Sequence, residues 1–262
     1  MSKFVVDRER CAKDGLCAAV SAAGVLKNGK GSYPEAIPGA FCYQCGHCVA
    51  VCPTEALSLQ GLPLEPMPPA ARDLPTAMQI DGLMASRRSV REFKSEPVDR
   101  ATMDALLDVA RRSPTAMNSQ LLHWIVAPDA AKVRAIAAEV VNWARESQDA
   151  YAAPAIGLWE QGYDMILRGA PTLVVVTAPA VHPFNREDAA IALTFLQLAA
   201  EARGLGVCWA GFLTAAAASY QPLQRALHVP EGHVVCGGLM LGTPKYKYRR
   251  IPPRKPLSAE WL

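Results

Sequence analysis

The sequence predicts an α+β protein made of a small cysteine-rich module and a larger domain of alternating helices and strands. Six of the eight cysteines lie before residue 53 of the 262-residue chain, which sets its N-terminal part apart. A proline-rich stretch follows. Beyond it, apolar periodicities typical of helices and of strands alternate. We therefore predict a first domain at residues 1–60, a linker at 61–75 and a second domain at 76–262.

The composition favours a folded protein and excludes some classes of function. Apolar residues make up 51% of the chain, and the chain is long enough for a large core. A net charge of +3 is too small to indicate nucleic-acid binding. No apolar run reaches membrane-spanning length, and residues 1–10 lack the apolar stretch of a signal peptide. We therefore expect a cytoplasmic protein.

The first domain is organised around the segment 42–53, CYQCGHCVAVCP. Its cysteines, Cys42, Cys45, Cys48 and Cys52, are followed by a proline, and this spacing is typical of bacterial ferredoxins that bind iron–sulfur clusters. Thiolates are soft ligands that suit such clusters. Zinc is the alternative, although zinc sites more often use two separated C-x-x-C pairs. A disulfide framework fits a secreted protein better than this one.

A weaker copy of the same spacing precedes this segment, with Cys11, Asp14, Cys17 and Ser21 in the four positions. The repeat predicts a pseudo-symmetric, ferredoxin-like iron–sulfur domain. The fourth cysteine of such a run normally ligates the other cluster, which gives two ligand sets. These sets are Cys11, Asp14, Cys17 and Cys52 for one cluster, and Cys42, Cys45, Cys48 and Ser21 for the other. Asp14 could leave a 3Fe-4S cluster. Alternatively, the two oxygen residues are turn residues and a single 4Fe-4S cluster is bound.

Five prolines separate this module from the rest of the chain, at positions 63, 66, 68, 69 and 75. Proline removes a backbone donor and favours extended conformations. The stretch from 61 to 75 is therefore predicted to be a semi-rigid linker, with the domain boundary inside it.

The second domain is predicted from caps and apolar patterns. Asp99, Asp129 and Asn185 are expected to cap helices at their N-termini, and Gly204 to end the last of these. The β-branched run 172–178 is apolar throughout and is expected to be a central strand. The remaining predicted elements are a helix at 76–86 and strands at 124–127, 207–210 and 234–241.

Three motifs in this domain carry a family resemblance. They are RRSVREF at 87–93, SPTAMNSQ at 113–120 and the basic tail LGTPKYKYRRIPPR at 241–254. The segment 76–262 resembles the nitroreductase family, and together with the cysteine motif the whole chain resembles its ferredoxin-fused branch. The resemblance implies a mixed sheet flanked by helices. It also implies a homodimer with FMN bound at two sites in the interface.

The resemblance assigns cofactor contacts to matching residues. Arginine presents a planar fork that suits phosphate oxygens, although a solvated basic turn is the simpler reading of the first motif alone. The implied contacts to the phosphate and ribityl chain are Arg87, Arg88, Ser89, Arg91, Asn118 and Gln120, with Lys247, Arg249 and Arg250 from the tail. Trp209, Ala210 and Gly211 would lie against the isoalloxazine. The chain differs from the usual family pattern at two places, with Ala210 where an acidic residue is common and Leu121-Leu122 where Pro-Trp is usual. Both differences concern the substrate pocket and the use of a pyridine nucleotide as donor.

These inferences predict an electron path from an external donor, such as a reduced ferredoxin, through iron–sulfur clusters and FMN to a small acceptor. Nitroaromatics, quinones and similar unsaturated compounds fit the family, and no side chain is assigned as a catalytic acid. Two alternatives remain open, an electron carrier that serves a partner protein and a flavin-handling or flavin-sensing protein. Cys208 and Cys236 are expected to be buried small hydrophobes.

Overall fold

The computed structural model describes residues 4–21, 26–27, 30–60, 69–147, 150 and 152–262. The chain divides into two compact units. The first comprises residues 1–74 with 115–119, and the second comprises 75–114 with 120–262. Most of the predicted linker, residues 61–68, lies outside the described residues. Each unit is described by itself.

The first unit consists of two similar halves. Its elements are β1 (Phe4–Val6), α1 (Leu16–Ala19), β2 (Leu26–Lys27), β3 (Glu35–Ala36), α2 (His47–Ala50) and β4 (Leu57–Leu59). Strand β1 pairs antiparallel with β4, and β2 pairs antiparallel with β3. Each half therefore contributes one strand to a pair with the other half. The helix of the second half begins 31 residues after that of the first, at 47 instead of 16.

The backbone repeats as well. Gly15 and Gly46, which precede the two short helices, have φ of 79° and 78°. Two residues earlier, Lys13 and Gln44 have φ of 55° and 53°. Positive φ is uncommon for residues other than glycine, so its recurrence at matched positions indicates one local structure built twice. The internal repeat read from the cysteine spacing is thus present in the backbone.

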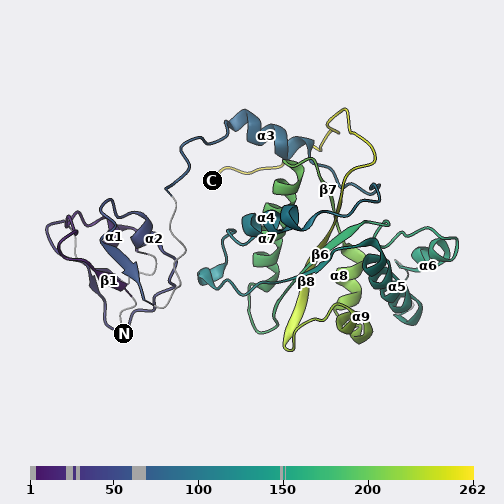
Figure 1. Ribbon diagram of the computed structural model, residues 1–262, viewed down its shortest axis with the longest axis horizontal. Coiled ribbons are helices and arrows are strands. Elements are labelled where there is room, and N and C mark those ends of the chain that lie inside the picture. Colours follow the sequence, from purple (N-terminus) through teal and green to yellow (C-terminus); the bar gives the residue numbers. More distant parts are fainter. Residues whose placement is uncertain (1–3, 22–25, 28–29, 61–68, 148–149, 151) are drawn as a thin grey trace. The chain divides into compact units, whose positions relative to one another are not determined.

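The second unit is a four-stranded sheet between two layers of helices (Figure 1). Its strands are β5 (His123–Ala127), β6 (Thr172–Pro179), β7 (Gly206–Trp209) and β8 (His233–Gly242), in the order β5-β6-β8-β7. Its helices are α3 (Ala77–Ser86), α4 (Arg100–Ala110), α5 (Ala130–Ser147), α6 (Ala153–Glu160), α7 (Asn185–Glu201), α8 (Gly211–Ala217) and α9 (Gln221–Ala226). The 3₁₀ turn η2 (Ala116–Asn118) belongs to the first unit.

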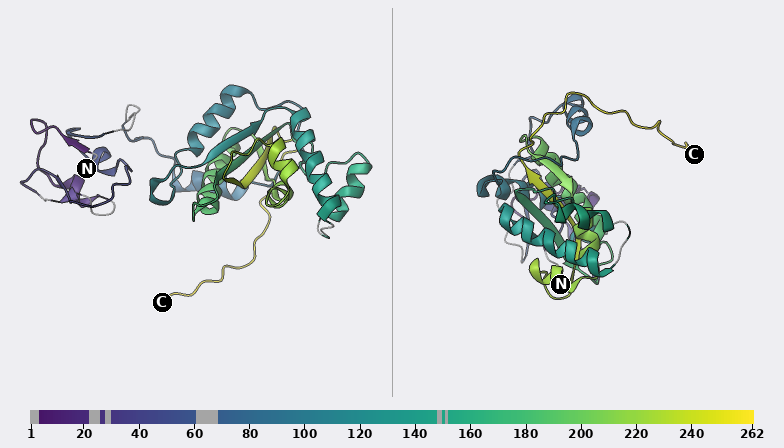
Figure 2. Two further views of the ribbon diagram at one scale, coloured as in Figure 1. Left: turned by 90° about the horizontal axis from the view of Figure 1, so that it is seen from below. Right: turned by 90° about the vertical axis from the view of Figure 1, so that its right-hand side faces the viewer.

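Helices cover both faces of the sheet, as Figures 1 and 2 show, and the residues Thr172–Ala178 of β6 are buried. Along β6, Leu173 and Val175 pack with the core around α5 and α8, whereas Val174 and Val176 pack with the core around α4 and α7. Successive strand residues point to opposite faces, so an apolar run fits a strand that is covered on both sides. The prediction of a central strand here is confirmed.

Side chains cap several of the helices, and the predicted cap at Asp99 is among them. The side chain of Thr76 caps α3 in a capping box with Gln79, and Asp99 Oδ1 accepts a hydrogen bond from Thr102 N at the start of α4. The predicted cap of α7 is wrong. Asn185 is the first residue of that helix, and its side-chain amide donates to Pro179 O at 3.4 Å.

The expected mixed sheet also needs correction. All three strand pairings of the four-stranded sheet are antiparallel. Within the described residues, the parallel pairing with this sheet is limited to a single bridge between Ser89 and Val207. The segment that contains Ser89 does not form a strand there. No helix in the described part of the chain is long and apolar enough to cross a membrane.

Candidate functional site

The arginine motif runs beside strand β7. Val90 N donates to Val207 O at 3.0 Å, and the buried Val90 side chain faces Gly206. Further along, Lys94 N donates to Thr243 O at 2.9 Å. In extended backbone, alternate side chains point to opposite sides. The motif is therefore held between β7 and the start of the C-terminal tail, with its side chains divided between two environments.

The odd-numbered residues of the motif gather near Cys208. Burial raises the pKa of the Cys208 thiol, while the positive charges of Arg91, Arg168 and Arg87 and a hydrogen bond with Ser89 oppose that rise. Cys208 is 5% exposed, as expected for a buried small hydrophobe. The charges of three guanidinium groups and a hydroxyl thus act on one buried position of β7, and two of these groups, Arg91 and Arg168, line a cavity with it.

A cavity of about 220 Å³ opens at this place and is called here the β7 cavity. Its lining includes Arg91, Arg168, Trp209, Gly211 and Phe212. In the described part of the chain, neither Arg91 nor Arg168 forms an ion pair with a carboxylate, and the same holds for Arg87. Unneutralised guanidinium groups beside a concave surface favour the binding of an anion.

Arg168 reaches this cavity through a tight turn. The carboxylate of Asp164 accepts hydrogen bonds from the backbone N–H groups of Ile166, Leu167 and Gly169, each at 2.9 Å. Arg168 has φ of 60° and donates from Nη1 to the Tyr163 hydroxyl at 2.8 Å. Sequence reasoning missed Arg168, since it stands in none of the three motifs. An Asp before an apolar run that ends in Arg-Gly was the one available signal.

The aromatic and small residues of the site differ in their exposure. Trp209 is 41% exposed and lines the β7 cavity, whereas Trp143 and Trp159 pack against the core. Ala210 is fully buried, and its N–H donates to Gly238 O at 2.9 Å. At Gly211, an added Cβ would have nothing within 4 Å. The wall of the β7 cavity therefore consists of the Trp209 indole and the backbone of the next two residues, with open space beside Gly211.

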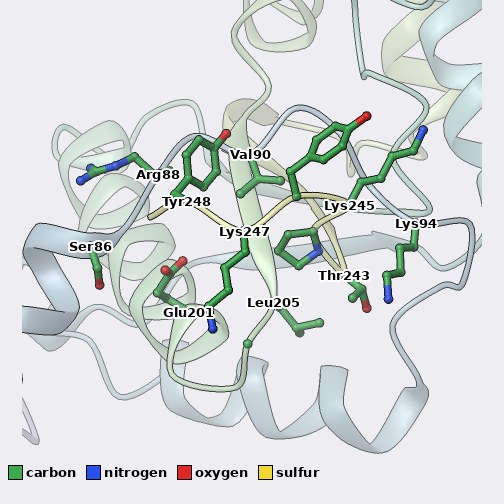
Figure 3. A pocket seen from close by; sticks show the side chains of 13 residues that line it. Ser86, Arg88, Val90, Lys94, Glu201, Leu205, Thr243, Lys245, Lys247 and Tyr248 are labelled. Atoms are coloured by element: carbon green, nitrogen blue, oxygen red, sulfur yellow. The ribbon is translucent and has the colours of Figure 1, made fainter. Parts of the chain in front are cut away.

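Arg88 and Lys247 line a second and larger cavity, of about 540 Å³ (Figure 3). Arg88 Nη1 donates to Arg87 O at 2.5 Å and Nη2 to Ala85 O at 2.7 Å. Its Nε is buried and has no hydrogen-bond partner among the described residues. Burial raises the pKa of Glu201 in the same cavity, against the opposing charges of Arg87 and Arg88. The structure thus places Arg88 apart from Arg91.

The remaining predicted contacts lie elsewhere. Asn118 belongs to the first unit, where its side-chain amide donates to Tyr43 O at 3.2 Å and Gln44 O at 3.3 Å. Gln120 belongs to the second unit and has φ of 50°. Arg249 and Arg250 are exposed and form no hydrogen bond or ion pair within the described residues.

The cysteines of the first unit lie near one another in the fold. Burial raises the pKa of Cys48, and the neighbouring Cys42, Cys45 and Cys17 raise it further. These three cysteines and Ser21 line one small cavity of about 20 Å³. Burial likewise raises the pKa of Cys17, whose charged neighbours are Asp14, Cys11 and Cys52. Residues that are far apart in the sequence thus lie near one another in the first unit, and their division into two ligand sets stays a prediction.

The two oxygen residues also serve the backbone. Asp14 is exposed, and its Oδ1 accepts a hydrogen bond from Leu16 N at 3.0 Å. Ser21 Oγ accepts a hydrogen bond from Leu26 N at 3.3 Å. Both contacts agree with the alternative that these residues are turn residues. No three His, Cys, Asp or Glu side chains in the described ranges are arranged to hold a single metal ion.

An α+β domain with an unneutralised basic cavity beside an exposed indole has the features of a cofactor-dependent enzyme. Residues 84–243 match the nitroreductase family. The chain belongs to this family and is a nitroreductase-like flavin oxidoreductase. This confirms the resemblance for the second domain. The match begins at residue 84, so the cysteine-rich unit lies outside it.

Individual relatives agree with this assignment. The chain is 31% identical over 189 residues to a 5,6-dimethylbenzimidazole synthase of Rhodospirillum rubrum, covering 64% of this chain and 83% of the relative. A nitroreductase with bound FMN from Desulfitobacterium hafniense is 25% identical, with a TM-score of 0.57, over 69% of this chain and 96% of that one. A nitroreductase with bound FMN from Bacteroides fragilis is 23% identical, with a TM-score of 0.57, over 69% and 95% of the two chains, and shares the fold.

Proposed function

We propose that this protein is an FMN-dependent oxidoreductase that receives single electrons through iron–sulfur clusters in its N-terminal module and reduces a small unsaturated acceptor. The observation that carries the flavin part is the β7 cavity, which Arg91 and Arg168 line together with Trp209. The charge of Arg87 and a hydrogen bond from Ser89 act on Cys208 in the same lining. FMN-bound relatives of the same fold support the choice of cofactor.

The residues of the β7 cavity fit an FMN. Arg87 and Arg91 would bind the phosphate through planar guanidinium forks, and Ser89 would add a hydroxyl. Arg168, fixed by the Asp164 turn, would supply further positive charge. Trp209 would cover the ring system and exclude water from it. When bound, FMN supplies both one-electron and two-electron chemistry.

The size of the cavity supports a dimer. At about 220 Å³ it is smaller than the roughly 300–1,000 Å³ typical of sites for small organic ligands. A site that two copies of the chain complete would account for this difference, and the nitroreductase resemblance implies such a homodimer with FMN at its interface. The basic tail, including Arg249 and Arg250, would then close on the phosphate.

The donor set of the first unit fits thiolate ligation. Cys42, Cys45 and Cys48 would hold one cluster together with Ser21 or a solvent ligand. Cys11, Cys17 and Cys52 would hold the second, with Asp14 as the fourth ligand or with that corner open. Such clusters carry single electrons at potentials set by their surroundings. The cavity between the first group is small, so ligation requires these side chains to move apart.

The acceptor is proposed to be a nitroaromatic, a quinone or a similar compound. No carboxylate or histidine is among the described residues that line the β7 cavity. The protons of the reaction would therefore come from water, and the chain's own residues would bind and orient the reactants. A low-potential donor, such as a reduced ferredoxin, would deliver the electrons.

A second candidate reaction follows from the Rhodospirillum rubrum relative. This relative is 31% identical to the chain, more than the solved nitroreductases described above, and it is a 5,6-dimethylbenzimidazole synthase. Formation of that compound by the flavin-loaded protein, detected by chromatography, would favour this function. Turnover of nitroaromatics without it would favour the reductase.

The test of the proposal is the cofactor content of anaerobically purified protein. We expect one FMN per chain, and about eight irons for two clusters or about four for one. The double variant Arg87→Ala/Arg91→Ala should lose FMN and keep its iron, whereas Arg100→Ala, a surface change on α4, should keep both. Flavin retained by the double variant would refute the phosphate assignment. Zinc without sulfide would refute the electron path.

The same preparation separates the enzyme from a carrier. An enzyme should oxidise dithionite or reduced ferredoxin at the expense of a nitroaromatic or quinone, with a rate that falls when flavin is lost. An electron carrier should be reduced rapidly and show no turnover with small acceptors.

A further inference from the structure

We propose that the larger cavity of the second unit is a separate binding site for a nucleotide-type ligand, that is, a small molecule with at least one phosphate and a flat ring. This cavity, called here the tail cavity, lies between the end of α3, the end of α7 and the start of the C-terminal tail. Figure 3 shows Arg88, Lys247 and Glu201 at one end and Lys94 and Thr243 at the other. The inference does not depend on flavin binding at the β7 cavity.

The charge of the tail cavity favours an anion. Four cationic side chains line it, from Arg88, Lys94, Lys245 and Lys247, against the single carboxylate of Glu201. The formal balance is therefore +3 at neutral pH. A concave surface with one dominant sign of charge focuses its potential and concentrates ligands of the opposite sign.

One of these cations is held in place before any ligand arrives. The guanidinium of Arg88 is fixed by two backbone carbonyls, those of Arg87 and Ala85. Its positive charge is therefore already positioned at this corner of the cavity, where it favours an anionic group of a ligand.

The size and the aromatic residues of the cavity narrow the ligand class. A volume of about 540 Å³ lies within the roughly 300–1,000 Å³ of small-molecule sites and exceeds what a lone phosphate needs. Tyr246 and Tyr248 border the cavity and are 65% and 54% exposed. Exposed aromatic rings are the usual surface on which nucleobases stack. Phosphate groups with an attached base therefore suit this site better than phosphate alone.

The tail cavity and the β7 cavity share no lining residue in the described part of the chain. The extended arginine motif separates them, because Arg88 and Val90 line the tail cavity whereas Arg91 lines the other. A ligand of the tail cavity would therefore occupy a second site. From there it could act through the shared Arg87–Arg91 backbone.

The test is the binding of ADP to the full-length, flavin-loaded protein by titration calorimetry, with inorganic phosphate and adenosine as comparators. We expect ADP to bind at least about tenfold more tightly than either comparator. Lys94→Ala should weaken ADP binding about tenfold by removing one charged contact. Glu201→Gln should tighten it, because it removes the only negative charge among the described residues that line the cavity. Lys132→Ala, which removes an exposed cation of α5, should change nothing.

Each result decides between two readings. Opposite effects of Lys94→Ala and Glu201→Gln, with unchanged flavin content, support the second site. Loss of FMN from Lys94→Ala would place the flavin in the tail cavity and overturn the proposal. Absence of ADP binding, insensitivity to both variants, or equal affinity for ADP and inorganic phosphate would overturn it as well.

Discussion

The contact between Gly206 and Val90 ties the fold to the candidate flavin site. A Cβ added at Gly206 would lie 2.8 Å from Cβ, Cγ1 and Cγ2 of Val90, a distance that packed carbon atoms do not reach. Val90 is 5% exposed, and its N–H is bound to Val207 O. It cannot rotate away from the added methyl group, since all three of its side-chain carbons are in contact. Gly206→Ala should therefore push the arginine motif away from β7.

The expected cost is that of overpacking a core contact, about 1–3 kcal/mol of unfolding free energy. Val90→Ala alone removes two carbon groups and should cost about 1.6 kcal/mol, at roughly 0.8 kcal/mol for each. The double variant Gly206→Ala/Val90→Ala should cost less than the sum of the two, because the smaller side chain removes the clash. Displacement of Ser89 and Arg91 should also weaken FMN binding in Gly206→Ala.

Tryptophan fluorescence during urea unfolding measures this effect in the relevant unit. All five tryptophans, at 124, 143, 159, 209 and 261, belong to the second unit. Gly157→Ala is a matched control, since a Cβ there meets nothing within 4 Å in helix α6, and it should be neutral or stabilising. Unchanged stability and FMN affinity in Gly206→Ala, or strictly additive costs in the double variant, would refute the reasoning.

Three further outcomes are expected. Asp164→Ala should lower the unfolding free energy by about 2–4 kcal/mol, because three backbone donors lose a charged acceptor. Asp104→Ala, a change at an exposed carboxylate, should alter the unfolding free energy by less than about 1 kcal/mol. A similar small loss for both variants would contradict the structural role of the Asp164 turn. Burial raises the pKa of Glu201 above its ordinary 4.5. The contribution of this residue to stability is therefore full below pH 4.5 and is lost as the pH rises through the pKa of the folded state. In urea titrations, Glu201→Gln should stabilise the fold near pH 7 and should not do so near pH 4. Cys45→Ser should lower the iron content by about half if two clusters are bound, whereas Cys236→Ser, a buried change in β8, should leave the iron content unchanged.

Much of the fold followed from signals that act over a few residues. Thr76 and Asp99 begin helices because their side chains bind backbone donors three residues ahead. The two halves of the cysteine module repeat because glycines at matched positions permit the same positive φ. The prediction for Asn185 was wrong because an asparagine side chain can bind a nearby carbonyl as well as a backbone N–H group. Here its amide donates to Pro179 O.

The sequence by itself determined the family of the second domain and the internal repeat of the cysteine module. Only the tertiary structure decided which arginines lie in the same cavity. The register of the motif against β7 is fixed by the Val90 hydrogen bond and by the space at Gly206, and it directs Arg91 to one cavity and Arg88 to another. Arg168 joins Arg91 through a turn far along the chain. Side-chain direction in an extended segment depends on long-range pairing, which local sequence does not specify.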